Sequence, residues 1–376
     1  MTKINVNTKF DGGSIEVVSI ANPQDLQFKI RHDTNSEFKQ WFYFQLTGVL
    51  DIDINITFKD MKTTAYPDGF KNYGIAMSYD NEYWTRIDTE FDGDNLKFSL
   101  NPSANSIYFA YFEPYSYHRH LGLIGEANES DLAKHEVLGQ TTEGRNMDLL
   151  VVGDEESAKH KIWVIARQHP GETMAEWFME GLVHRLIDEQ DSISVKLLQD
   201  CVFYLVPNMN PDGGCHGNLR VNTHGANLNR EWLNPTKDRS PEVYCVREKM
   251  KQTGVDMFFD IHGDESIPYI FTAGCQENPT FSKKQQELSA KFSKYYELVN
   301  PDYQTIVGYE VGQFDSEIAT LATNWVGDTF DCLAYTLEMP FKDNCNLPDP
   351  VHGWDGRRSY LLGESLLTAI NFVLRA

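Results

Sequence analysis

The spacing of apolar residues changes near residue 112, and this change limits the possible fold more than any other feature of the sequence. Up to that point, short runs rich in β-branched and aromatic residues are separated by turn clusters such as Asp11-Gly12-Gly13. The runs expected to be strands are Ser14–Ile20, Leu26–Arg31, Trp41–Leu46, Ile52–Phe58, Tyr83–Ile87, Leu96–Leu100 and Ser106–Phe112. Short strands at this spacing are typical of an all-β sandwich.

After about residue 130, expected strands alternate with expected helices. The apolar runs that predict strands are Lys161–Arg167, Val202–Val206 and Val255–Ile261, and the helical patterns are Thr173–Ile187 and Asp355–Leu374. This alternation indicates an α/β domain whose helices cover a mostly parallel or mixed sheet. We therefore predict an N-terminal β-sandwich domain over residues 1–115 and an α/β domain with a mixed sheet over residues 116–376.

Composition argues against several classes of partner. The chain has 55 acidic and 33 basic residues and a net charge of -22, which disfavours binding to nucleic acid or to an anionic membrane. No run approaches the roughly 18 to 20 apolar residues of a membrane-spanning helix, and residues 1–18 contain no apolar signal-peptide core. The six cysteines are scattered without a CxxC pair, which favours free thiols and a cytoplasmic location.

A candidate metal site follows two of the expected strands. His169 and Glu172 lie three residues apart on a turn between a strand and an amphipathic helix, and His262 ends another apolar strand. Ligands in open α/β sheets gather beyond the carboxyl ends of the strands. Two histidines and a glutamate form the open ligand set of a hydrolytic zinc site. The alternatives are that Glu172 only begins a helix and that His262 is a buried hydrogen-bonding residue.

Further polar residues could act on a substrate beside such a metal. Glu338 follows the expected strand Cys332–Leu337, where a buried carboxylate is costly unless it is paired or used. Burial would raise its pKa and suit it to accept a proton from water. Arg220 and Arg230, which follow an Asn-Pro-Asp-Gly turn, could bind a carboxylate at two points. A salt-bridged core position for Glu338 and surface salt bridges for the arginines remain alternatives.

The motifs HPGET, NPDG, NLNREW, DIHGD and TLEMP occur in this order along the chain. In this ordered set the chain resembles the zinc carboxypeptidases of the funnelin type, and in particular the cytosolic carboxypeptidases. The segments QWFYFQLTG and FAYFEPYSYHRHLGLI are similar to the N-terminal domain of that subgroup. The resemblance implies a carboxypeptidase-like α/β/α domain preceded by the β-sandwich.

The resemblance also implies a role for each site residue. The residues that would ligate Zn²⁺ are His169, Glu172 and His262. Glu338 would act as general base on metal-activated water and then protonate the leaving amine, while Arg220 would stabilise the oxyanion. Asn229 and Arg230 would bind the free carboxylate of the substrate. The implied activity is hydrolysis of the C-terminal residue of a peptide or protein.

The sequence departs from the family pattern in two features, the first of which concerns the relatives that remove glutamate. Such enzymes resemble one another in having a basic residue in the specificity pocket, whereas the stretch Ile318–Trp325 contains none. An unpaired glutamate side chain would bind poorly there, so we do not expect a strict deglutamylase. Tyr309 lies near the place of the family's substrate-capping tyrosine, but no motif identifies it and it is not included in the expected site.

Two other functions remain as alternatives from the sequence. A zinc deacylase of N-acyl amino acids shares the two histidines, the glutamate and the Asn-Arg pair, although a small substrate would not need the β-rich domain. A non-catalytic peptide-binding module on the same fold would be supported by loss of a metal ligand or of Glu338. The three candidate ligands and Glu338 are all present.

Overall fold

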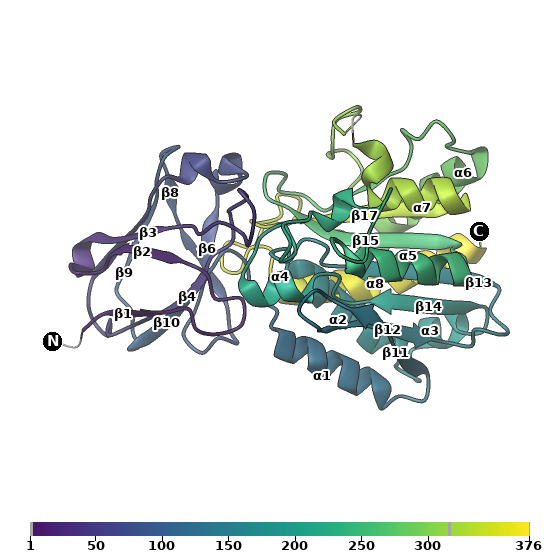
Figure 1. The fold of residues 1–376 in the computed structure, drawn as a ribbon, viewed down its shortest axis with the longest axis horizontal. Coiled ribbons are helices and arrows are strands. Elements are labelled where there is room, and N and C mark those ends of the chain that lie inside the picture. The colour runs from purple at the N-terminus through teal and green to yellow at the C-terminus, as the bar shows by residue number, and fades with distance from the viewer. Residues whose placement is uncertain (1–2, 315–316, 376) are drawn as a thin grey trace.

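The computed structural model describes residues 3–314 and 317–375. Within these ranges, none of the helices has the length and apolar character needed to cross a membrane. The ribbon has two parts, a strand-rich part at the N-terminus and a larger part in which helices surround a sheet (Figure 1).

The N-terminal part is a sandwich of two five-stranded sheets. One sheet has the order β1 (Asn5–Asn7), β4 (Tyr43–Thr47), β10 (Ser106–Ala110), β6 (Gly74–Ser78) and β7 (Thr85–Asp88). The other has the order β2 (Glu16–Ser19), β3 (Leu26–Lys29), β5 (Ile54–Phe58), β9 (Leu96–Leu100) and β8 (Glu90–Phe91). All strand pairs are antiparallel except β3 with β5.

Aromatic residues fill the space between these two sheets. Phe28 of β3 and Phe44 of β4 have ring centroids 5.0 Å apart, and Phe98 of β9 and Phe109 of β10 are 5.3 Å apart. These pairs join one sheet to the other, so the predicted β-sandwich is confirmed. Strands β1, β6 and β8 were not expected, because β1 and β8 are very short and the small residues of β6 give no alternating pattern.

The second part is built on a mixed seven-stranded sheet. Its order is β11 (Ala133–Gln140), β12 (Asn146–Val152), β14 (Cys201–Val206), β13 (His160–Ala166), β15 (Met257–Asp264), β17 (Leu333–Pro340) and β16 (Phe271–Gly274). The central strands β14, β13, β15 and β17 are parallel. Strands β12 and β16 are antiparallel to the central strands that they pair with, and the edge strand β11 is antiparallel to β12. The predicted mixed sheet is therefore confirmed.

Helices cover both faces of this sheet, which gives the predicted α/β/α layers. Alternate residues of β13 divide between two cores: Ile162 and Val164 belong to one, and Trp163 and Ile165 to the other. The first core includes residues of α1 (Tyr117–Asn128), α2 (Met174–Leu186), α3 (Ser192–Leu197), α6 (Lys283–Val299) and α8 (Gly356–Arg375). The second includes residues of α5 (Pro241–Thr253) and α7 (Ala322–Phe330).

The two parts share an extensive interface. The rings of Tyr111 and Phe341 stack with centroids 4.6 Å apart. The Arg86 guanidinium donates hydrogen bonds to the carbonyl oxygens of Phe341 and Trp354, at 3.0 and 3.1 Å. Helix α1 begins at Tyr117, just after the β-rich part, while the division between residues 115 and 116 stays a prediction.

Candidate active site

The predicted site residues lie at the carboxyl ends of the central parallel strands. His262 and Glu338 are direct partners in the register of β15 and β17. His169 comes three residues after the end of β13, which lies on the other side of β15. Because parallel strands end at the same edge of a sheet, residues far apart in the sequence meet here.

His169, Glu172 and His262 offer ligand atoms that all lie within 4.8 Å of one another. The two oxygens of Glu172 lie 2.7 Å from Nδ1 of His169 and 2.8 Å from Nδ1 of His262. The other ring nitrogen of each histidine is already bonded, to Oδ1 of Asn227 at 3.0 Å and to Oδ2 of Asp260 at 2.9 Å. These outer bonds orient each imidazole with Nδ1 toward a common point, as in metal sites.

This donor set fits a zinc ion. Two imidazole nitrogens and a carboxylate are the ligands of hydrolytic zinc sites, which keep a further position open. Burial lowers the pKa of His169 to about 4, so its imidazole is neutral and its Nδ1 lone pair is available. Asp260 and Glu172 raise the pKa of His262 well above its usual value although burial lowers it, which reflects a local negative potential that favours a cation.

Backbone contacts shape the turn that carries the first two candidate ligands. Arg167 has a φ of 59°, an uncommon conformation for a residue other than glycine. Its guanidinium donates to the carbonyl oxygen of Pro170 at 2.9 Å. Gly171 donates from its N–H to the carbonyl oxygen of Leu219 at 2.8 Å, and a Cβ at Gly171 would lie 2.9 Å from Cα of Leu219. Glycine is therefore required where the two loops meet.

Glu338 faces the same point and is only 5% exposed. Burial raises its pKa to about 8, and a hydrogen bond from Tyr309 opposes this shift. Among the described residues, Oε2 of Glu338 has no hydrogen-bond partner. An unpartnered oxygen on a carboxylate with a raised pKa suits a group that accepts a proton during a reaction.

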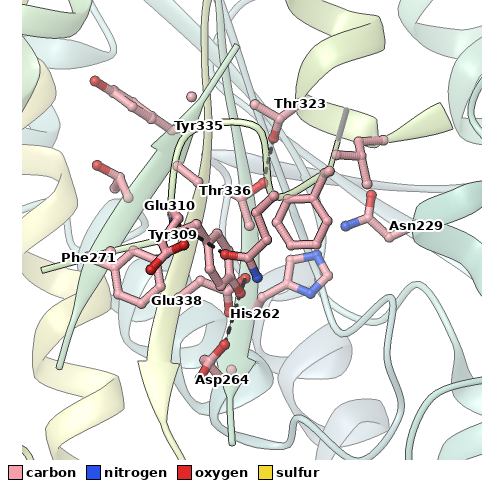
Figure 2. Close-up of a pocket in the computed structure, with 18 of the residues that line it drawn as sticks. Asn229, His262, Asp264, Phe271, Tyr309, Glu310, Thr323, Tyr335, Thr336 and Glu338 are labelled. Carbon is pink, nitrogen blue, oxygen red and sulfur yellow. Dashed lines mark hydrogen bonds between the residues drawn. The ribbon is translucent and has the colours of Figure 1, made fainter. Parts of the chain in front are cut away.

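Tyr309 is a site residue that sequence analysis did not include. Its hydroxyl lies 2.8 Å from Oε1 of Glu338 and 3.1 Å from Oδ2 of Asp264, and Figure 2 shows both contacts. The ring packs edge-on against Phe271 with centroids 5.0 Å apart. Tyr309 lies outside helices and strands, so no periodic pattern in the sequence points to it.

Arg220, Asn229 and Arg230 line the same cavity, which has a volume of about 600 Å³. Asn229 accepts a hydrogen bond at Oδ1 from the N–H of Ala322 at 2.9 Å, so its Nδ2 group is left for a ligand. Arg230 donates from Nη1 to the carbonyl oxygen of Asn229 at 2.9 Å and forms an ion pair with Glu317. Three of the predicted polar residues thus converge near the candidate metal ligands.

One part of the cavity wall is polar but carries no basic group among the described residues. Its wall includes Ser293, Tyr335 and Asn324, and the hydroxyls of Thr323 and Thr336 are 2.8 Å apart (Figure 2). Apart from Arg220, Arg230 and the two histidines, none of the described lining residues is basic. The stretch Ile318–Trp325, in which no basic residue was found, contributes Ile318, Leu321, Thr323 and Asn324 to the wall.

Comparison with known proteins assigns the family. Residues 6–112 match the family model described as the cytosolic carboxypeptidase N-terminal domain, and residues 125–355 match the model described as zinc carboxypeptidase. The chain belongs to the zinc carboxypeptidase family. It is therefore a metal-dependent hydrolase, a metallo-carboxypeptidase, and the family resemblance seen in its motifs is confirmed.

Two relatives of this carboxypeptidase match over most of their length. It is 42% identical to an uncharacterized protein of Zymomonas mobilis, over 98% of this chain and 96% of that one. It is 26% identical to cytosolic carboxypeptidase 6 of Caenorhabditis elegans, over 88% of this chain and 77% of the relative.

Solved structures agree with this assignment. A metallo-carboxypeptidase from Burkholderia cenocepacia is 46% identical with a TM-score of 0.97, and the match covers 99% of each chain. A metallo-carboxypeptidase from Pseudomonas aeruginosa, solved with (2-guanidinoethylmercapto)succinic acid, is 41% identical with a TM-score of 0.96, again over 99% of each chain.

Proposed function

We propose that this carboxypeptidase releases single residues from the C-termini of peptides or proteins, using Zn²⁺ held by His169, Glu172 and His262. The observation that carries the proposal is the convergence of these three ligand atoms within 4.8 Å of one another, in a cavity that Glu338 also lines. A cytoplasmic location is part of the proposal. It is supported by six free cysteines and by the cytosolic carboxypeptidase name of a relative.

Each catalytic residue has a defined task in this proposal. Zinc, when bound, lowers the pKa of water and polarises the scissile carbonyl. Glu338 accepts the proton of the attacking water and passes it to the leaving amine, a role suited to a buried carboxylate whose Oε2 has no partner among the described residues. Arg220 stabilises the negative charge that develops on the carbonyl oxygen, and such a contact is worth about 3 to 4 kcal/mol in the barrier.

The free carboxylate of the substrate is assigned to Asn229 and Arg230. The planar guanidinium of Arg230 can bind a carboxylate at two points, and the Nδ2 group of Asn229 can add a third hydrogen bond. Arg230 pairs with Glu317, whose side chain is half exposed. Binding of substrate therefore requires Arg230 to exchange one carboxylate for another, a small cost because a pair with one half-exposed partner contributes little free energy.

The pocket for the terminal side chain favours uncharged residues. Its hydroxyl and amide groups can bond to neutral polar side chains, whereas a glutamate would find no basic partner beyond the arginines assigned to backbone groups. Leaving a charge unpaired in a partly buried site costs several kcal/mol. Glu277 and Glu310, which also line the cavity, add repulsion against an acidic residue.

The proposal is tested by incubating the protein with a panel of peptides that have free or amidated C-termini, with and without a chelator. Chelator-sensitive release of one C-terminal residue from free peptides only, abolished in Glu338→Gln, is the expected result. Hydrolysis of small N-acyl amino acids in place of peptides would replace the proposal with the deacylase. Absence of turnover on either panel, in protein saturated with zinc, would favour a peptide-binding module.

A further inference from the structure

We propose that the N-terminal domain completes the active site by positioning Arg220, and that Asp33 is the positioning residue. The inference rests on the proposed function in one respect, the role of Arg220 at the oxyanion. The candidate metal ligands and Glu338 all belong to the α/β part of the chain, on strands or on a turn directly after one. Arg220 differs from them because it lies in an irregular loop that does not directly follow a strand.

The segment that carries Arg220 has irregular backbone. Residues 217–227 contain no helix or strand. The backbone groups on either side of Arg220 need partners from elsewhere, since buried N–H groups are costly when unpaired. For the N–H groups of residues 219–221, the partner comes from the N-terminal domain.

The carboxylate of Asp33 is the hydrogen-bond partner of all three N–H groups. Its Oδ1 accepts from the N–H of Leu219 at 2.7 Å, and its Oδ2 accepts from the N–H groups of Arg220 and Val221 at 2.7 and 3.3 Å. Asp33 is 5% exposed, so water does not compete strongly for these bonds. Burial raises the pKa of Asp33 to about 6 and the three N–H groups oppose this shift, so the carboxylate is ionised at neutral pH.

Contacts on both sides of Asp33 extend this attachment. Thr34 donates from its N–H and its hydroxyl to Oδ1 of Asn218, at 3.0 and 3.1 Å. Asn35 donates from Nδ2 to the carbonyl oxygen of Thr223 at 2.8 Å. Gly225 has a φ of 74°, and a Cβ there would lie 2.3 Å from the carbonyl oxygen of Asn35. The two loops therefore pack in one register with backbone in close contact.

Aromatic residues of the N-terminal domain also hold the Arg220 side chain. The guanidinium carbon lies 5.6 Å from the ring centroid of Phe38 and 5.5 Å from that of Tyr66. Within the described residues, no hydrogen bond engages this guanidinium, which lines the cavity. Contact with aromatic rings restrains an arginine while leaving its N–H groups free for a substrate oxygen.

The expected effect of losing Asp33 is on turnover and not on binding. A displacement of about 1 Å at a catalytic group can reduce the rate about 100-fold. We expect Asp33→Ala to lower kcat roughly 10- to 100-fold with KM within about twofold, since the oxyanion forms only in the transition state. Asp33→Ala added to Arg220→Ala should cause no further loss, because its effect passes through Arg220.

Controls separate this effect from a general weakening of the interface. Thr34→Val removes the adjacent hydroxyl contact but leaves Asp33 in place, and it should keep kcat within about twofold. Zinc content is measured in every variant, because Leu219 also contacts the metal-ligand turn through Gly171. Asp33→Asn, which keeps one acceptor oxygen, replaces Asp33→Ala in these measurements if Asp33→Ala does not fold. Loss of zinc from the Asp33 variants would overturn the proposal. So would an equal loss of kcat when Asp33→Ala is made in the wild type and in Arg220→Ala.

Hydrogen exchange gives a readout that does not depend on turnover. The amides of Leu219, Arg220 and Val221 should exchange slowly in the wild-type protein and faster in the Asp33 variants, with those of strand β13 unchanged. Unchanged protection at residues 219–221 would overturn the positioning role. If the wild-type protein has no peptidase activity, the proposed function is wrong. The exchange experiment would still decide whether Asp33 orders residues 219–221.

Discussion

The hydroxyl of Tyr309 lies 2.8 Å from Oε1 of Glu338, so a loop residue contacts the carboxylate that is proposed to transfer the proton. Asp264 lies on the other side of this hydroxyl at 3.1 Å. The Tyr309 ring is also held edge-on by Phe271 and Phe314, with centroids 5.0 and 5.2 Å away. The loop therefore brings a polar group to Glu338 in a defined orientation.

Tyr309→Phe should lower kcat/KM about three- to tenfold. The change keeps the aromatic packing and removes one hydrogen bond, which contributes about 0.5–1.5 kcal/mol. Steady-state kinetics on a peptide with a free C-terminus measures the effect. Tyr83→Phe, at an exposed position that contacts His352, is the matched control and should leave the kinetics unchanged. Equal activity of the two variants would show that Tyr309 does not act on Glu338.

Asp260→Asn should weaken metal binding roughly 10- to 100-fold, since Asp260 accepts the outer hydrogen bond of His262 and such partners contribute about this much to affinity. Competition with a chromophoric chelator measures the zinc affinity directly. Asp256→Asn is the control, because this residue accepts a hydrogen bond from the Lys161 N–H away from the site. A variant that binds zinc as tightly as the wild type would contradict the assignment of His262 as a ligand oriented by Asp260.

The pocket predicts a ranking of C-terminal residues. Peptides that end in neutral residues should be cleaved at least about tenfold more efficiently than those that end in glutamate, because the glutamate carboxylate would be left unpaired. Thr336→Lys, which places a cation two residues before Glu338 on β17, should narrow this difference. Relative kcat/KM values on matched peptides measure it. A wild-type preference for glutamate would refute this view of the pocket.

Stability should depend on pH through His120, which is 2% exposed and bonds to Glu176 at 2.7 Å and to Asp148 at 3.1 Å. Burial lowers its pKa, but these carboxylates raise the pKa to about 9, above the usual 6.5. The contribution to folding is therefore complete below pH 6.5 and is lost as the pH rises through about 9. Its size is of the order of 3 kcal/mol.

Urea unfolding of the wild type and His120→Gln between pH 6 and pH 10 tests this pH dependence. The free energy of unfolding should differ most at the acidic end of the range, and the difference should shrink toward pH 10. His184→Gln removes a partly exposed histidine that pairs with Glu126, and it should keep the wild-type pH profile. A difference between wild type and His120→Gln that stays constant with pH would contradict the assignment.

Most of the secondary structure follows from local patterns in the sequence. The apolar run at residues 161–167 and the helical spacing at residues 173–187 correspond to β13 and α2 within a residue or two at each end. Alternation and helical spacing report which side of an element is buried, so they predict layers. Strand β6 was not anticipated, because its Gly74-Ile75-Ala76-Met77-Ser78 sequence is stabilised by its neighbours β10 and β7 and not by its own pattern.

The candidate catalytic centre could also be proposed from the sequence. His169, His262 and Glu338 each follow or end an apolar strand, and parallel strands place such positions at one edge of a sheet. The type of residue then indicates the chemistry, since two histidines and a glutamate are zinc ligands. The structure brings together the predicted residues, including Arg220, Asn229 and Arg230, around one cavity.

The sequence by itself determined the order of the layers, the family and the residues that meet at the sheet edge, because each of these depends on local pattern or motif. Only the tertiary structure decided that Tyr309 contacts Glu338 and that Asp33 holds the backbone of Arg220. Asp33 and Arg220 are separated by 187 positions and both lie in irregular segments. A contact of this kind arises from the packing of one domain against another, and no periodicity in the chain records it.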